Sequence, residues 1–358
     1  MVRKVRRAIH ALLRDDAVDV GRRVVALYAV LTAANIGAWA WAFTAFRHFP
    51  LLLGTALLAY GLGLRHAIDA DHIAAIDNVT RKLMQDGQKP VAIGLFFALG
   101  HSTVVVVASV VIALGTHALA SEFSSLREIG GLIGTCASAS FLMLIAIANL
   151  VTLRGVYRAF RVVRRGGALS DDEIDRIMHQ RGFLARLLQP LFRLASRSWH
   201  LYPIGLLFAL GFETASEISL FGVSARSSEE LSGLAVLVFP ALFAAAMTLV
   251  DTLDGVLMLG AYGWAYVNPI RKLFYNLTIT TVSVLVAFII GGIEALGLVA
   301  EHLALDGPVW RLIVDLNQNA GTLGYVIVAL FVVSWGASAT IYHLKGYERA
   351  VPRSGSRA

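Results

Sequence analysis

Residues 91–115 read VAIGLFFALGHSTVVVVASVVIALG. This stretch carries one ionisable side chain, His101, and exceeds the roughly 20 apolar residues that a helix needs to cross a bilayer. Similar apolar blocks recur along the chain, and together they predict an all-α, polytopic membrane protein with about eight transmembrane helices. The eight predicted spans are residues 24–46, 50–76, 91–115, 131–153, 203–224, 234–259, 275–300 and 321–343.

The composition of the 358-residue chain agrees with a membrane protein. Hydrophobic residues make up 57% and charged residues 15%, whereas an ordinary soluble domain has about 25% charged residues. The mean hydropathy is +0.69. These values exclude a soluble, fibrous or disordered chain. The single cysteine, Cys136, excludes an internal disulfide framework and a metal cluster built on several cysteines.

The distribution of basic residues predicts the orientation. With the N-terminus inside, 26 of the 31 Lys and Arg residues fall in cytoplasmic segments and one falls in each of the four outer loops. Such a bias is typical of cytoplasmic loops, so we predict that both termini are cytoplasmic. Residues 1–23 lead into an uncleaved first span. The net charge of +7 is explained by loops facing anionic lipid and does not require nucleic acid.

The longest loop, 154–202, divides the predicted spans into two groups of four. Residues 170–191 begin with Ser-Asp-Asp-Glu and continue with apolar residues at nearly helical spacing, which predicts an amphipathic helix on the inner membrane surface. The predicted segments are a basic N-terminus (1–23), helices 1–4 (24–153), the basic loop (154–202), helices 5–8 (203–343) and a cytoplasmic tail (344–358).

Ionisable residues inside the predicted spans point to function. Each costs about 2.5–3.5 kcal/mol at mid-bilayer on insertion scales. One cluster holds six carboxylates and three histidines against a single arginine, and such a cluster requires a cation, protons or both. Glu294 stands alone in the seventh span, and we give it a structural role. The cluster comprises Arg65, His66, Asp69, Asp71, His72, His101, Glu213, Glu217, Asp251 and Asp254.

The types of side chain narrow the choice of cation. Imidazole suits nickel, cobalt, zinc and copper(II), whereas a set of carboxylates alone would suit magnesium, calcium or manganese. In an unbroken helix His66, Asp69 and His72 share one face and Asp71 lies off it. Asp71 can therefore bind the same ion only if the helix is kinked or unwound, which Gly61 and Gly63 could permit. Otherwise Asp71 serves another partner, such as Arg65.

Four motifs, in order along the chain, resemble those of the nickel/cobalt transporter family (NiCoT). The resemblance covers nearly the whole chain and includes the eight-span layout. Its core is His66 followed by Asp71 and His72. The motifs are RHAIDADHI (residues 65–73), LFFALGHSTVV (95–105), LGFETASE (210–217) and LVDTLDG (249–255).

The resemblance also implies roles for individual residues. It implies that His66, Asp71 and His72 bind the metal, and Asp69 is either a ligand or a partner of a histidine. His101 is a ligand or a proton carrier. The family usually has Asp at the position of Glu213 and Thr at that of Ser216, so the carboxylate of Glu213 reaches further by one methylene.

Two other positions bear on metal choice by resemblance. The position of Ile68 is usually Val or Phe in the family and is linked to which metal is carried. Asn35 matches a site that holds Asn or His, where Asn accompanies nickel preference. We therefore predict that Asn35 contacts the site, that Arg65 pairs with a carboxylate, and that Glu213, Glu217, Asp251 and Asp254 line the pathway or tune the site.

The predicted function is a secondary transporter that takes up nickel, and also cobalt, across the bacterial cytoplasmic membrane. The metal is the substrate, and no cofactor or obligatory protein partner is predicted. The alternatives are a nickel or cobalt exporter and the membrane component of a multi-subunit importer. An enzyme is disfavoured because the chain has no Walker A loop, dinucleotide fingerprint or His-Glu-x-x-His motif.

Overall fold

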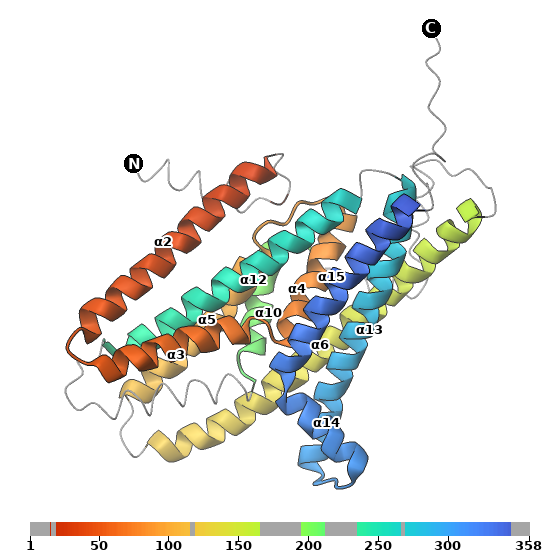
Figure 1. Cartoon of the computed structure of the whole chain (residues 1–358). Helices are drawn as coiled ribbons and strands as arrows, with labels where there is room; N and C mark the ends of the chain where they lie inside the picture. The colour runs from red at the N-terminus through yellow and green to blue at the C-terminus, as the bar shows by residue number, and fades with distance from the viewer. Residues whose placement is uncertain are drawn as a thin grey trace.

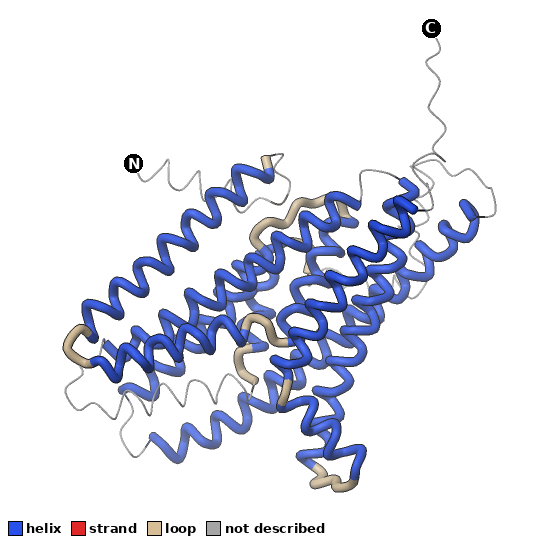
Figure 2. Tube along the Cα trace, in the orientation of Figure 1, coloured by secondary structure: helices blue, strands red, loops and turns tan. Residues whose placement is uncertain are grey.

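A computed structural model describes residues 15, 19–114, 119–164, 195–211, 235–265 and 269–344. Within these ranges the chain is helical, with turns and bends between helices and no strand (Figure 2). The helices are α2 (Val20–Phe46), α3 (Pro50–His66), α4 (Ala70–Gln85), α5 (Ile93–Leu114), α6 (Leu119–Arg164), α10 (Leu201–Phe208), α12 (Val238–Ala265), α13 (Pro269–His302), α14 (Pro308–Gln318) and α15 (Ala320–Leu344), with short 3-10 helices at Ser198–His200 and Ala235–Leu237.

The predicted all-α architecture is confirmed over the described residues. Five of their helices are long and apolar enough to cross a membrane, and the number rises to seven if each of two bent helix pairs forms one span. The predicted span 203–224 lies partly outside the described residues, as do most of the central loop and the C-terminal tail. An exact count of eight therefore stays a prediction.

The two bent pairs interrupt what the sequence presents as continuous spans. Helices α3 and α4 meet at 49°, and α14 and α15 meet at 77°. A kink in the second span, which the sequence left open as one of two alternatives, is therefore present. It lies at residues 67–69 and not at Gly61 or Gly63, which are both inside α3.

The core of the bundle forms around α12 and around the pair of α6 and α13. Helix α12 packs against α2, α3, α4 and α5, while α13 packs along α6 and also contacts α15 (Figure 1). The backbones approach closely where small residues face a neighbouring helix. Gly63 in α3 lies against the backbone of Phe243 in α12, leaving no room for a side chain. Such small residues allow close helix packing in membranes.

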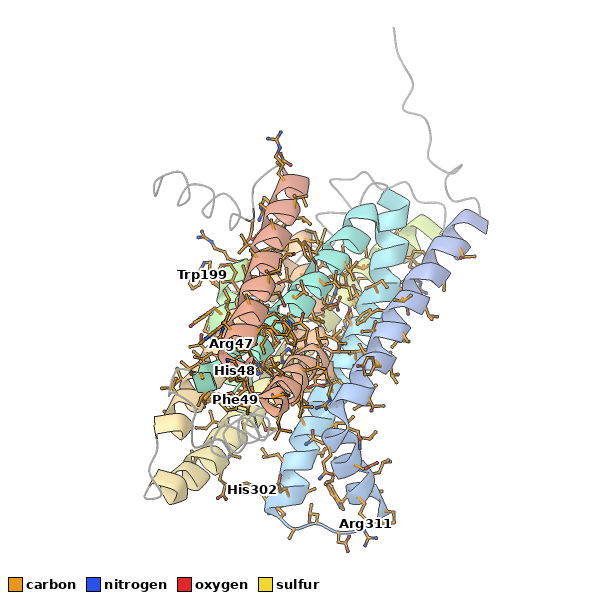
Figure 3. The ribbon with its side chains drawn as sticks, turned by 60° about the vertical axis from the view of Figure 1, so that its left-hand side comes forward. Arg47, His48, Phe49, Trp199, His302 and Arg311 are labelled. Carbon is orange, nitrogen blue, oxygen red and sulfur yellow. The ribbon has the colours of Figure 1, made fainter. Side chains whose placement is uncertain are left out.

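The start of α2 and the end of α15 lie at the same end of the molecule, and α14 lies at the opposite end (Figure 1). His302 and Arg311 mark the connection between α13 and α14, while Arg47 and His48 mark the turn between α2 and α3 (Figure 3). In that α13–α14 connection Arg311 donates two hydrogen bonds to Asp306. These bonds hold the pKa of the Asp306 carboxyl below its usual range.

Candidate metal site

Three histidines meet inside the bundle. His66 ends α3, His72 lies in the first turn of α4, and His101 lies on α5. The Nε2 atoms of His66 and His101 are 3.1 Å apart, and each ring offers one nitrogen within 4.8 Å of those of the other two. The three residues are at most 4% exposed. We call His66, His72 and His101 the histidine cluster.

The break between α3 and α4 brings two of these rings together. The amides of Ile68 and Asp69 bond back to the carbonyls of Arg65 and His66, both at 3.0 Å. Asp69 then adopts an extended conformation at the N-cap of α4. The chain changes direction here, so the ring centroids of His66 and His72 lie 4.8 Å apart although they belong to different helices.

Two carboxylates lie against the histidine cluster on its Nδ1 side. Oδ1 of Asp251 on α12 is 3.2 Å from Nδ1 of His72, and Oδ2 of Asp69 is 3.2 Å from Nδ1 of His66. Where Asp251 accepts the Nδ1 proton of His72, it fixes the tautomer of that ring and leaves its Nε2 available to a metal. The buried Nε2 of His72 has no hydrogen-bond partner among the described residues and is therefore available as a ligand atom.

Asp71 lies apart from the histidine cluster. Its Oδ1 accepts a hydrogen bond of 2.9 Å from the backbone N–H of His72, and its carboxylate lines the adjoining cavity. Arg65 pairs with Asp69, with Nη2 and Oδ1 3.9 Å apart. Among the alternatives left open by the sequence, Asp69 is thus the described partner of Arg65. Asp71 instead faces the cavity.

A cavity of about 720 Å³ adjoins the histidine cluster. His66, His101 and Asp71 line its inner part, and the exposed residues Glu301 and Gln318 line the end near α14. The cavity therefore connects the buried nitrogen atoms with the surface at the end of the molecule where α14 lies (Figure 1). Glu294, for which we predict a structural role, also lines the cavity.

A family model described as NicO, high-affinity nickel-transport protein, matches residues 52–341. The chain belongs to the NicO family. It is 56% identical over 333 residues to the high-affinity nickel transport protein of Cupriavidus necator, which covers 93% of this chain and 95% of that relative. No solved structure matches the chain.

Other relatives carry names for nickel or cobalt. The hydrogenase nickel incorporation protein HupN of Bradyrhizobium diazoefficiens is 53% identical over 317 residues, covering 88% of this chain and 83% of that protein. The cobalt transport protein NhlF of Rhodococcus rhodochrous is 43% identical over 298 residues, covering 82% and 84% respectively. The family and the apolar helices together make this chain a multi-pass membrane protein.

Asn35, another predicted site residue of this NicO-family chain, lies outside the histidine cluster. The amide of Asn35 donates to the carbonyls of Leu31 and Ala245 at 2.9 and 3.2 Å and accepts from the Tyr60 hydroxyl at 3.0 Å. It thus joins α2, α3 and α12 and is not part of the histidine cluster.

Ile68 lies in the α3–α4 break, and its carbonyl faces Gly324 of α15. Asp254 lies on α12 after Asp251, and its buried Oδ2 has no hydrogen-bond partner within the described ranges. Glu213 and Glu217 lie outside the described residues, so their roles stay predictions.

A second buried polar network was missed by the sequence analysis. Asp77 accepts hydrogen bonds of 2.6 Å from both Tyr262 and Ser283, and Arg81 donates to Thr280 and Asn78. Arg81 is fully buried, although it lies between the predicted spans 50–76 and 91–115. The sequence does contain a sign of this network, because Asp77 and Arg81 are four residues apart and would lie on one face of a helix.

Proposed function

We propose that this chain is a single-chain permease that takes up Ni²⁺, and also Co²⁺, across the bacterial cytoplasmic membrane. The observation that carries the proposal is the histidine cluster, buried in a NicO-family membrane protein beside a cavity that reaches the surface. Imidazole ligands suit nickel and cobalt. The relatives named for nickel and for cobalt support the same choice of substrate.

In this proposal His66, His72 and His101 bind the ion, while Asp69 and Asp251 orient His66 and His72. Neutral imidazole is required for metal binding, and the neighbouring carboxylates offset part of the charge of the ion. Asp71, which lines the inner part of the cavity, attracts the ion toward the cluster. Asn35 acts from beside the cluster by holding α2 against α3 and α12.

We further propose that the chain has eight spans and that both termini are cytoplasmic. The excess of Lys and Arg in the segments assigned to the inside supports this orientation, as does the placement of the start of α2 and the end of α15 at one end of the molecule. The cavity then faces outward. A divalent ion moving into a negative-inside cell gains about 4.6 kcal/mol per 100 mV, which is twice the single-charge value.

Accumulation of radiolabelled nickel tests the proposal. A host lacking its own nickel importers would express this chain alone, at trace nickel, with cobalt, zinc or manganese as competitor. We expect accumulation that cobalt blocks. We expect His66→Ala, His72→Ala and His101→Ala to abolish it at normal membrane expression, because each substitution removes one nitrogen ligand.

The matched control is His48→Ala, because His48 is exposed in the turn between α2 and α3 (Figure 3). This variant should accumulate nickel as the unmodified chain does. Normal accumulation by all three cluster variants would refute the site. Absence of accumulation by the unmodified, well-expressed chain would refute single-chain uptake.

A further inference from the structure

Glu294, Asp71 and Ser138 come from three different helices and line the same cavity. Glu294 lies on α13, Asp71 on α4 and Ser138 on α6. Glu294 is close enough to Asp71 for the two carboxylates to interact electrostatically, and Ser138 lies beside Glu294. None of the three belongs to the histidine cluster.

Two of these three residues have a buried side-chain oxygen that forms no hydrogen bond within the described ranges. The Ser138 side chain is buried, with 5% of the residue exposed, and its hydroxyl makes no hydrogen bond within the described ranges. The same holds for the buried Oε2 of Glu294. Neither Asp71 nor Glu294 forms an ion pair in the part of the chain that the structure describes. Two neighbouring carboxylates in a membrane protein are costly unless a cation, protons or both offset their charge.

We propose that Glu294, Asp71 and Ser138 form a second cation site, lined by oxygen atoms, in the cavity outside the histidine cluster. We call it the oxygen site. It deepens the proposed function, on which it rests, because it gives the incoming divalent ion a first binding position. Oxygen ligands hold hard or partly hydrated cations, whereas the histidine cluster favours borderline transition metals.

The cavity has room for this order of events. A water molecule occupies about 30 Å³ of liquid, so a cavity of about 720 Å³ holds a divalent ion with its hydration shell. Asp71 precedes His72 in the chain and lines the cavity together with His66. An ion bound at the oxygen site therefore lies next to the imidazoles that replace its water. Selection among metals then occurs at the histidine cluster and not at the oxygen site.

Mn²⁺ binding to the purified full-length chain in lipid nanodiscs tests the oxygen site directly. Mn²⁺ prefers oxygen ligands, and the loss of its free paramagnetic resonance signal reports binding. We expect Mn²⁺ to bind the unmodified chain and the His66→Ala/His101→Ala double variant alike. Glu294→Gln and Ser138→Ala should weaken that binding by roughly tenfold or more, in line with the loss of one group that supports a metal.

Glu301→Gln is the matched control. Glu301 lies on the same helix face as Glu294, two turns nearer the α14 end, and it is exposed. The Glu301→Gln variant loses the same charge as Glu294→Gln and should bind Mn²⁺ nearly as the unmodified chain does. The Glu294→Asp variant keeps a carboxylate and should retain part of the Mn²⁺ binding. Tight Ni²⁺ binding by Glu294→Gln would show that this variant is folded. Its nickel uptake should have a higher KM and a nearly normal maximal rate.

The outcomes separate the two proposals. Mn²⁺ binding by Glu294→Gln equal to that of the unmodified chain overturns the oxygen site. Loss of Mn²⁺ binding in the histidine double variant overturns it too, because the two sets of residues would then form one site. The proposed function fails by a different result, namely normal nickel uptake in the histidine variants.

Discussion

His66 and His72 each face a carboxylate at Nδ1, and this contact determines which nitrogen is available to a metal. His72 Nδ1 contacts Asp251 and His66 Nδ1 contacts Asp69, both at 3.2 Å. In the His72 ring Nε2 is then available to a metal, and the Nε2 atom of His66 lies 3.1 Å from that of His101. Asp251 therefore acts on the metal through His72, in our interpretation, without binding it.

Asp251→Asn tests this role of the carboxylate. Asparagine keeps the shape but removes the charge that stabilises the Nδ1–H tautomer of His72. We expect nickel affinity to fall by about 10–100-fold, the usual effect of changing a residue that orients a ligand. Nickel binding to the purified chain measures the effect.

Thr252→Val is the control for Asp251→Asn. The Thr252 side chain is fully buried on the same helix, and its hydroxyl forms no hydrogen bond within the described ranges. Valine has nearly the same shape as threonine, so the Thr252→Val variant should bind nickel as the unmodified chain does. Equal affinity of Asp251→Asn and Thr252→Val would show that Asp251 does not orient His72.

The sequence identified the residues of the histidine cluster but not their arrangement. His66, His72 and His101 follow from the rule that ionisable residues in apolar spans are functional. Asp251 could be predicted only as lining or tuning the site, because its contact with His72 joins residues 179 positions apart. The surroundings of Glu294 could not be predicted for the same reason: its neighbours Asp71 and Ser138 come from other helices and give no local signal.

At the level of elements, the α3–α4 break is held in place by α15. Gly324 lies against the carbonyl of Ile68, the middle residue of the break, so that an added Cβ would overlap that oxygen. Helix α15 also packs along α4. The close contact at Gly324 therefore fixes the position at which α3 ends and the histidine cluster begins.

Gly324→Ala should displace the break and impair uptake. Overpacking of this kind costs about 1–3 kcal/mol, and here the displaced backbone belongs to the turn between His66 and His72. We expect a lower unfolding temperature in detergent and reduced nickel accumulation. Gly336→Ala is the control on the same helix, since no atom lies within 4 Å of its added Cβ. Equal uptake by the two variants would contradict the proposed role of Gly324.

The Asp77 network makes a separate prediction about stability. Asp77→Ala removes the acceptor for the buried hydroxyls of Tyr262 and Ser283. A buried donor left without a partner costs about 1–3 kcal/mol, so we expect a decrease of at least this size in the free energy of unfolding. Denaturant unfolding in mild detergent measures it. Asp86→Ala, at an exposed position after the same helix, should unfold like the unmodified chain.

The helical spans were predictable, but the end of α4 was not. The apolar block 50–76 is followed by Asp77, Asn78, Arg81 and Lys82, and such a polar run normally marks a loop. In the structure α4 continues to Gln85 with these side chains buried. Arg81 and Asn78 bond to groups on other helices, namely Thr280 and Asn149. Hydropathy detects apolar spans and overlooks a polar helix whose partners are distant in the sequence.

At the scale of the whole molecule, the histidine cluster separates two different regions. On the α14 side lies the cavity with Glu294 and Glu301. On the other side, α4 continues into the packed network around Asp77 and Arg81. Such an arrangement suits a transporter that admits an ion from one face while the opposite face is sealed. The side of the membrane to which the cavity opens depends on the orientation of the chain.

Cysteine labelling of spheroplasts decides the orientation. In a Cys136→Ser background that still accumulates nickel, Gln318→Cys places a thiol at the α14 end of the cavity and Asp86→Cys places one beyond the end of α4. Both native side chains are exposed. We expect a membrane-impermeant maleimide to label Gln318→Cys in intact spheroplasts and Asp86→Cys only after permeabilisation. This result follows from the excess of basic residues on the proposed cytoplasmic side. The reverse pattern would place the cavity on the cytoplasmic face and would contradict the proposed orientation.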